Sequence, residues 1–157
     1  MAQESPENAP EVIMLVRHGE KPGEGTEPHG VNAEGKHNGH SLSVLGWTRA
    51  GALAGFFAHA PSPAHPNVVK PERILATRPT PDAKSKREID TAIPTARRLN
   101  IEIEDDHTHG NEKDLVGEVL GRPESTLIFW HHGTMSKIAR HFPVVNKKDI
   151  PHRRCVY

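Results

Sequence analysis

Residues 12–20 read VIMLVRHGE, an unbroken apolar run that ends on an arginine, a histidine and a glycine. Five consecutive apolar residues at 12–16 are typical of a strand buried on both faces. A strand that only packed a core would more usually end in Asn, Asp, Ser or Pro. Residues 126–133, TLIFWHHG, repeat the arrangement, so two buried strands are expected to end on a histidine followed by glycine.

Helical and strand patterns alternate between these two runs. Apolar residues recur at helical spacing in the segments 50–57, 89–99 and 135–142, a weaker helix is expected over 112–120, and strands are expected at 73–77 and 100–104. Pro94 predicts that the second helix becomes regular only near Thr91, because a proline is tolerated in a first turn. The alternation predicts an α/β fold, a three-layer αβα sandwich with a mostly parallel central sheet.

The gross composition fits one domain. The chain has 157 residues, of which 34% are hydrophobic, so we expect one modest core and long polar loops. Residues 1–10 are expected to form a disordered tail and residues 11–157 a single domain. Residues 21–41 hold five glycines and read as a long surface loop. A final strand within IPHRRCVY is expected to be missing or reduced to its last three residues.

Charge and cysteine content restrict the partners and the compartment. The 20 basic and 20 acidic side chains cancel, so nothing suggests a nucleic-acid partner. Cys155 is the single cysteine and fits a reducing compartment. The sequence has no apolar run of membrane-spanning length and no leader pattern at its start, and a cytoplasmic protein is expected.

The two histidine–glycine pairs are expected to meet at one edge of the sheet. Ligands in open α/β sheets bind beyond the carboxyl ends of the parallel strands. Glycine after each histidine lets the backbone turn sharply, and a helix that starts just after His132 would direct amide groups at an anion. Because Arg17 adds a guanidinium suited to phosphate, the residues Arg17, His18 and His132 predict a phosphoryl site.

Four segments in order resemble the histidine phosphatase superfamily, which has the phosphoglycerate-mutase-like fold. They are LVRHGEKP, LSVLGWTRAGALAGFF, REIDTAIPTARRL and LIFWHHGTMSKIA, and together they span most of the chain. The resemblance implies that His18 is the nucleophile and that Arg17 and Gly19 belong to the phosphate-binding motif.

The later segments resemble the family's remaining motifs. REIDTA is similar to the Arg-x-x-Gln-Thr-Ala stretch of the family, which implies a second phosphate-binding arginine at Arg87, although Asp90 stands where glutamine is common. Arg78 also follows a predicted strand and is the alternative second arginine. His132 corresponds to the late histidine of the family, and it rather than His131 is expected to line the pocket, because successive strand residues point to opposite faces.

The expected activity is that of a metal-independent phosphatase without a cofactor. Neutral His18 would attack phosphorus to give a phosphohistidine, which water then hydrolyses. The arginines and His132 would stabilise the equatorial oxygens. The expected partner is a small phosphorylated substrate or a phosphoprotein. The alternatives are a catalytically weak regulatory module that binds phosphorylated ligands, and a phosphomutase.

The general acid has no clear motif. In the family a carboxylate after the third strand often protonates the leaving group, and Glu112 is preferred here because it stands near a predicted helix start. A plain helix N-terminal carboxylate is the alternative reading of Glu112. The histidines of the 29–40 loop have no compact zinc spacing, so an exposed loop is favoured over a metal site. His107 and His109 stand beside two aspartates and offer a metal site as the alternative, but an exposed turn is favoured there too.

Overall fold

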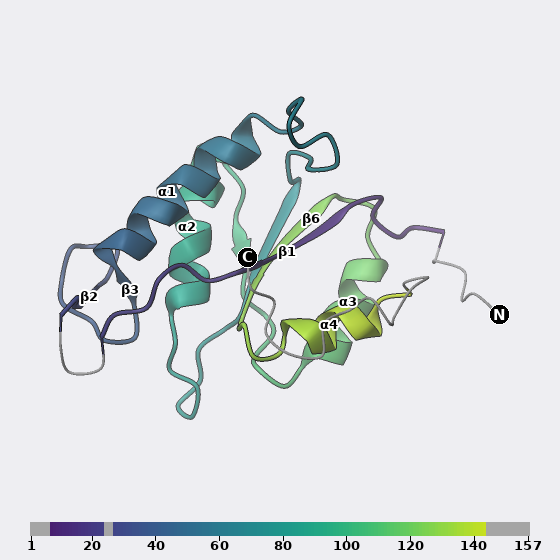
Figure 1. Ribbon diagram of the computed structural model, residues 1–157. Helices are drawn as coiled ribbons and strands as arrows, with labels where there is room; N and C mark the ends of the chain where they lie inside the picture. The colour runs from purple at the N-terminus through teal and green to yellow at the C-terminus, as the bar shows by residue number, and fades with distance from the viewer. Residues whose placement is uncertain (1–6, 24–26, 144–157) are drawn as a thin grey trace.

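The computed structural model describes residues 7–23 and 27–143, and its centre is a parallel sheet in the strand order β1-β6-β4-β5 (Figure 1). The strands are β1 (Ile13–Arg17), β4 (Arg73–Ala76), β5 (Ile103–Glu104) and β6 (Thr126–Trp130). β1 pairs with β6 from Ile13 opposite Thr126 to Arg17 opposite Trp130. The two strands therefore end level with each other, and both histidine motifs emerge at the same edge.

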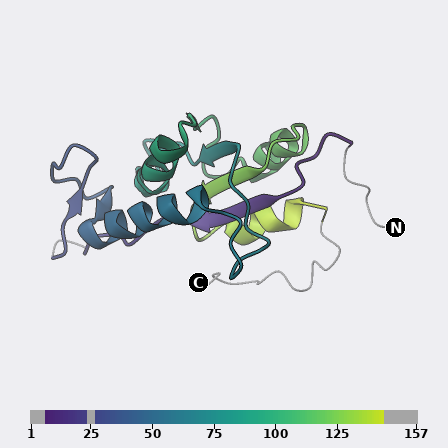
Figure 2. The ribbon, with the colours of Figure 1, turned by 90° about the horizontal axis from the view of Figure 1, so that it is seen from above.

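Helices cover both faces of the sheet, as Figures 1 and 2 show. α1 (Val44–Ala58) and α2 (Arg87–Leu99) lie on one face, and α3 (Glu112–Leu120) and α4 (Met135–His141) lie on the other. Along β6, Leu127 and Phe129 pack in the core under α1 and α2, whereas Ile128 and Trp130 pack in the core under α3 and α4. Because both faces are buried, β6 is apolar from Leu127 to Trp130. The predicted αβα sandwich is confirmed.

The segment expected to be one long loop contains a small hairpin, so that prediction was wrong in part. β2 (Gly30–Val31) pairs antiparallel with β3 (Leu42–Ser43), which leads directly into α1. The indole Nε1–H of Trp47 donates to the Val31 carbonyl at 2.6 Å and ties the hairpin to the helix. Two paired residues in each strand gave no detectable alternation in the sequence.

The start of α2 was predicted one turn too late. The helix begins at Arg87 rather than near Thr91, and Pro94 lies inside it. The amide of Asp90 donates to the Lys86 carbonyl at 2.8 Å, so a complete turn forms before the proline. The side of α2 that carries Ala92 is buried against the sheet. This burial stabilises the helix by more than the loss of the hydrogen bond that a proline cannot donate.

Some expectations fall outside the described residues. The final strand proposed within IPHRRCVY and most of the predicted N-terminal tail lie there. Of the helices in the described part of the chain, none is long and apolar enough to cross a membrane.

Candidate active site

His18 follows the last residue of β1 and is almost completely buried, with 5% of its surface exposed. Its Nδ1 lies 2.6 Å from the carbonyl oxygen of Gly19. A carbonyl only accepts, so this contact requires the proton on Nδ1 and leaves the lone pair of a neutral ring on Nε2. The ring is thus held in the tautomer that presents a nucleophilic Nε2.

His132 faces that nitrogen from the end of β6. Its Nδ1 lies 3.3 Å from His18 Nε2, and the rings meet edge to face at 73° with centroids 5.4 Å apart. In the neutral pair, His132 Nδ1–H is the donor and His18 Nε2 the acceptor. The pairing of β1 with β6 therefore brings together two histidines that are 114 positions apart in the sequence.

A cavity of about 680 Å³ opens beside the two histidines. Its polar lining comprises Arg17, His18, Gly19, Glu20, Lys21, Arg49 and His132. Three permanent cations and one carboxylate make the lining positive, which suits an anionic ligand. The Arg49 Nε–H donates to Glu20 Oε1 at 2.6 Å, and this bond lowers the pKa of Glu20. The sequence analysis missed Glu20, Lys21 and Arg49, although Glu20 and Lys21 directly follow the first motif.

Close backbone approach explains the glycine of the first motif. A Cβ at Gly19 would stand 2.9 Å from the Gly46 carbonyl oxygen in the first turn of α1. The Gly19 amide donates to Thr91 Oγ1 at 2.9 Å, so this N–H is already used within the protein. Gly19 also lines the cavity, and its expected part in phosphate binding stays a prediction.

His131 lies next to the histidine pair, with its ring centroid 4.5 Å from that of His132. Its ring lies 5.1 Å from that of His109 and 6.5 Å from that of His18, and it is not among the residues that line the 680 Å³ cavity. Burial lowers the pKa of His131; the Glu88 carboxylate acts against this effect, and the positive charge of Arg87 adds to it. His131 therefore favours the neutral form next to the site.

The two candidate arginines differ in their surroundings. Arg87 begins α2 and donates to the Gly39 carbonyl from Nη2 at 3.0 Å and to the Ser41 carbonyl from Nε at 3.3 Å. Arg78 instead lies 3.5 and 3.6 Å from carboxylate oxygens of Asp105 and Asp106. Neither arginine lines the cavity. Arg87 keeps its whole cationic charge, because its two partners are neutral carbonyls, whereas carboxylates offset the charge of Arg78.

Glu112 lies behind the site rather than in the cavity. Its Oε1 accepts from the Gly110 amide at 3.2 Å and from the Trp130 indole at 3.4 Å, and the side chain is buried. Burial raises the pKa of Glu112, but hydrogen bonds from its own amide and from Gly110, Thr134 and Trp130 outweigh it, so the net shift is downward. The hydrogen bonds that Glu112 accepts favour its ionised form and match the alternative reading of Glu112 as a helix N-terminal carboxylate. Its part as the general acid stays a prediction.

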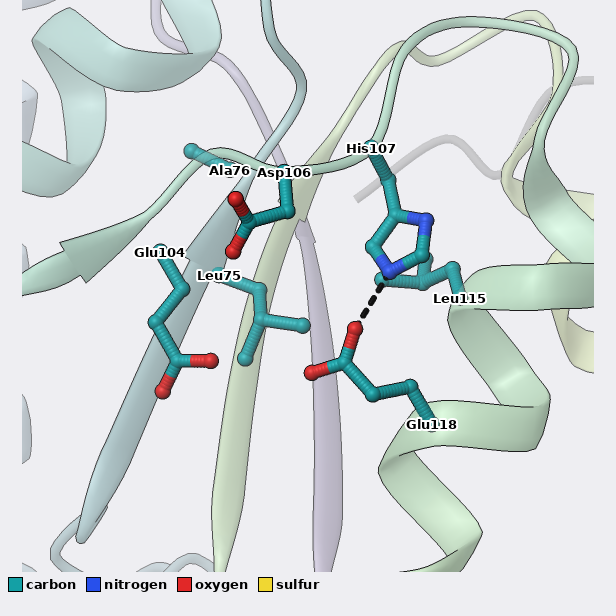
Figure 3. A pocket seen from close by; sticks show the side chains of 7 residues that line it. All are labelled: Leu75, Ala76, Glu104, Asp106, His107, Leu115 and Glu118. Carbon is teal, nitrogen blue, oxygen red and sulfur yellow. Dashed lines mark hydrogen bonds and ion pairs between the residues drawn. The ribbon is translucent and has the colours of Figure 1, made fainter.

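The loop before α3 is fixed by a separate charged cluster, part of which Figure 3 shows. His107 Nε2 lies 2.5 Å from Glu118 Oε2, and the same carboxylate accepts from the buried guanidinium of Arg73. Arg73 also donates to both oxygens of Glu104. This cluster anchors the loop that carries His109 to the site. Within residues 7–23 and 27–143, no three His, Cys, Asp or Glu side chains are arranged to hold a metal ion.

Comparison with known proteins shows the fold. No protein-family model and no curated protein sequence matches the chain. Among solved structures, it resembles a mycobacterial hydrolase at 16% identity, with 82% of this chain and 76% of that chain covered and a TM-score of 0.51. It also resembles mycobacterial glucosyl-3-phosphoglycerate phosphatase at 17% identity, with 86% and 82% covered and a TM-score of 0.51. The chain has the phosphoglycerate-mutase-like fold. The same phosphatase with VO3 gives a TM-score of 0.51 at 16% identity, with 88% and 85% covered.

Proposed function

We propose that the protein is a metal-independent histidine phosphatase that acts through a phosphohistidine on His18. The observation that carries the proposal is the pairing of His18 Nε2 with His132 Nδ1 at 3.3 Å beside a positively lined cavity. The solved structures of similar fold include a phosphatase, one of whose structures contains VO3. A small phosphorylated metabolite or a phosphoprotein is the proposed substrate, and no nucleic acid is involved.

The proposed reaction has two displacement steps. In the first, His18 Nε2 forms a bond to phosphorus while the bond from phosphorus to the leaving oxygen breaks, and the leaving group departs with that electron pair. In the second, water attacks phosphorus, Nε2 leaves, and inorganic phosphate and a proton are released. His132 Nδ1–H, which donates to Nε2 in the free protein, transfers its hydrogen bond to a phosphoryl oxygen and stabilises the charge there.

The arginines have separate parts in this proposal. Arg17 lines the cavity next to the nucleophile and holds phosphoryl oxygens by its planar fork. Arg87 supplies a second positive charge from the first turn of α2; its guanidinium lies outside the lining of the cavity and is fixed by its carbonyl partners at Gly39 and Ser41. In such reactions, catalysis comes mainly from positive groups that position the loosely bonded phosphoryl group and stabilise its negative charge.

The test is to trap the intermediate. Protein mixed with a ³²P-labelled aryl phosphate and quenched in alkali should carry an alkali-stable, acid-labile label. His18→Ala should lose the label and lower kcat/KM on the order of 10³-fold or more, as expected when a nucleophile is removed. His59→Ala, which alters an exposed histidine at the end of α1, should keep both.

The outcomes separate the alternatives. A label that persists in His18→Ala would contradict His18 as the nucleophile. Binding of inorganic phosphate or vanadate without any turnover would instead favour the regulatory module that binds phosphorylated ligands. Transfer of the label to a second alcohol in preference to water would identify a phosphomutase.

A further inference from the structure

A continuous line of hydrogen bonds runs from the ring of His18 into α2. His18 Nδ1–H donates to the Gly19 carbonyl, and the Gly19 amide donates to Thr91 Oγ1 at 2.9 Å. The Thr91 hydroxyl in turn donates to the Arg87 carbonyl at 2.6 Å. One hydroxyl therefore joins the loop after β1 to the first turn of α2.

The environment of Thr91 makes this hydroxyl difficult to replace. Its side chain is fully buried at 0% exposure, so water has no access to the Gly19 amide from that side. A hydroxyl both accepts and donates, and Thr91 uses both capacities. A side chain of the same shape without the hydroxyl would leave the buried Gly19 amide without its partner, which is costly for a backbone group.

We propose that Thr91 is a positioning residue: it holds the N–H of the His18–Gly19 peptide, and thereby the backbone of Gly19, whose carbonyl sets the tautomer and orientation of the His18 ring. The Gly19 carbonyl belongs to the next peptide, between Gly19 and Glu20, and it selects the Nδ1–H tautomer only while Gly19 keeps its backbone conformation. The Gly46 carbonyl, which would stand 2.9 Å from a Cβ at Gly19, confines this residue on one side, and Thr91 holds its amide on the other. The importance of this arrangement for catalysis rests on the proposed function.

The same hydroxyl links two parts of the proposed site. Arg87, whose carbonyl accepts from Thr91, is also the residue that supplies the second cationic charge. The nucleophile and this arginine are thereby held in one relative position, although they belong to different elements. Positioning errors of about 1 Å at a reacting group can cost on the order of 100-fold in rate.

The chain offers a matched control on the same helix. Thr95 lies one turn beyond Thr91 and is equally buried, but its Oγ1 has no hydrogen-bond partner among the described residues. Thr91→Val should lower kcat for an aryl phosphate by roughly 10- to 100-fold with little change in KM. Thr91→Ser, which keeps the hydroxyl, should recover most of that loss, and Thr95→Val should retain the wild-type kcat.

A second readout does not require activity. Nitrogen-15 NMR of the imidazole rings reports the tautomer of His18 directly, and Thr91→Val should reduce the Nδ1–H population that Thr91→Ser and Thr95→Val preserve. If Thr91→Val does not fold, Thr91→Ala takes its place in both measurements. A folded variant without the hydroxyl that keeps the wild-type tautomer and kcat would overturn the proposal. A wild-type protein without turnover would refute the proposed function, while the tautomer measurement would still decide the role of Thr91.

Discussion

Gly46 has no side chain, so the first turn of α1 can touch the backbone that follows His18. A Cβ there would stand 2.6 Å from the Glu20 carbonyl oxygen and 3.0 Å from the Leu42 Cβ. Gly46→Ala should therefore displace the loop and lower the free energy of unfolding by about 1–3 kcal/mol. Gly51→Ala, at an exposed position of the same helix with no atom within 4 Å, should raise it by roughly 0.5–1 kcal/mol. Urea denaturation measures both, and a stabilised Gly46→Ala variant would contradict the close approach.

His131 provides a prediction about pH. The pKa of His131 is lowered in the native state. The unfolded chain therefore binds the proton more tightly than the native state does, with an imidazole pKa of about 6.5. The contribution of His131 to the free energy of unfolding is therefore fully present above about pH 6.5. It is lost as the pH falls from there through the folded-state pKa, by at most about 1.4 kcal/mol per pH unit. Between about pH 7.5 and about pH 5, His131→Asn should lose less free energy of unfolding than the wild type. Equal losses in denaturant titrations would show that His131 contributes nothing to the pH dependence.

Individual site residues were predictable where a motif marked them. His18 and His132 stand out in the sequence because each follows an apolar run and precedes glycine, and the structure brings them together. Arg49 is different, because its contact with Glu20 depends on the angle at which α1 meets the loop. The environment of Glu112 was equally hidden, since it depends on the position of the Trp130 indole.

Among the elements, β4, β5 and α3 are joined by one buried arginine. Arg73 is 2% exposed and donates to Glu104 at 2.8 and 2.5 Å as well as to Glu118. Arg73→Met would leave two carboxylates without this partner, and we expect a loss of about 3–5 kcal/mol in the free energy of unfolding. Arg122→Met, which removes an exposed arginine that pairs with Glu104 and Glu124, should cost far less. Similar losses in the two variants, measured by thermal or urea unfolding, would argue against the buried cluster.

The elements could be predicted where their pattern was long and periodic. The apolar runs that became β1 and β6 and the helical spacing that became α1 are all visible in the sequence. The β2–β3 hairpin has only two residues in each strand, which is too short for a periodic signal. In α2, tertiary packing overrides the local preference of Pro94, and no local pattern reveals that.

At the scale of the whole molecule, the alternation of strands and helices predicted the layers but not the order of the strands. The site requires β1 and β6 to be neighbours, and this follows from how the helices pack on the two faces rather than from any single segment. The same limit applies to the substrate. The shape of the cavity depends on α1, α4 and the loop after β1 together, so its specificity is a property of the assembled fold.

The distance between the two halves of the candidate site along the chain also has a consequence for the time at which the site can assemble. β4, α2 and β5 are consecutive elements within residues 73–104, so they can associate while later residues are still being added. β1 is made first, yet its partner β6 is among the last elements to be made, and contacts between such remote segments close slowly. His18, the proposed nucleophile, therefore leaves the ribosome early, and its partner His132 emerges only later. A chain released before that point would contain the whole first motif but would lack the second histidine of the proposed site.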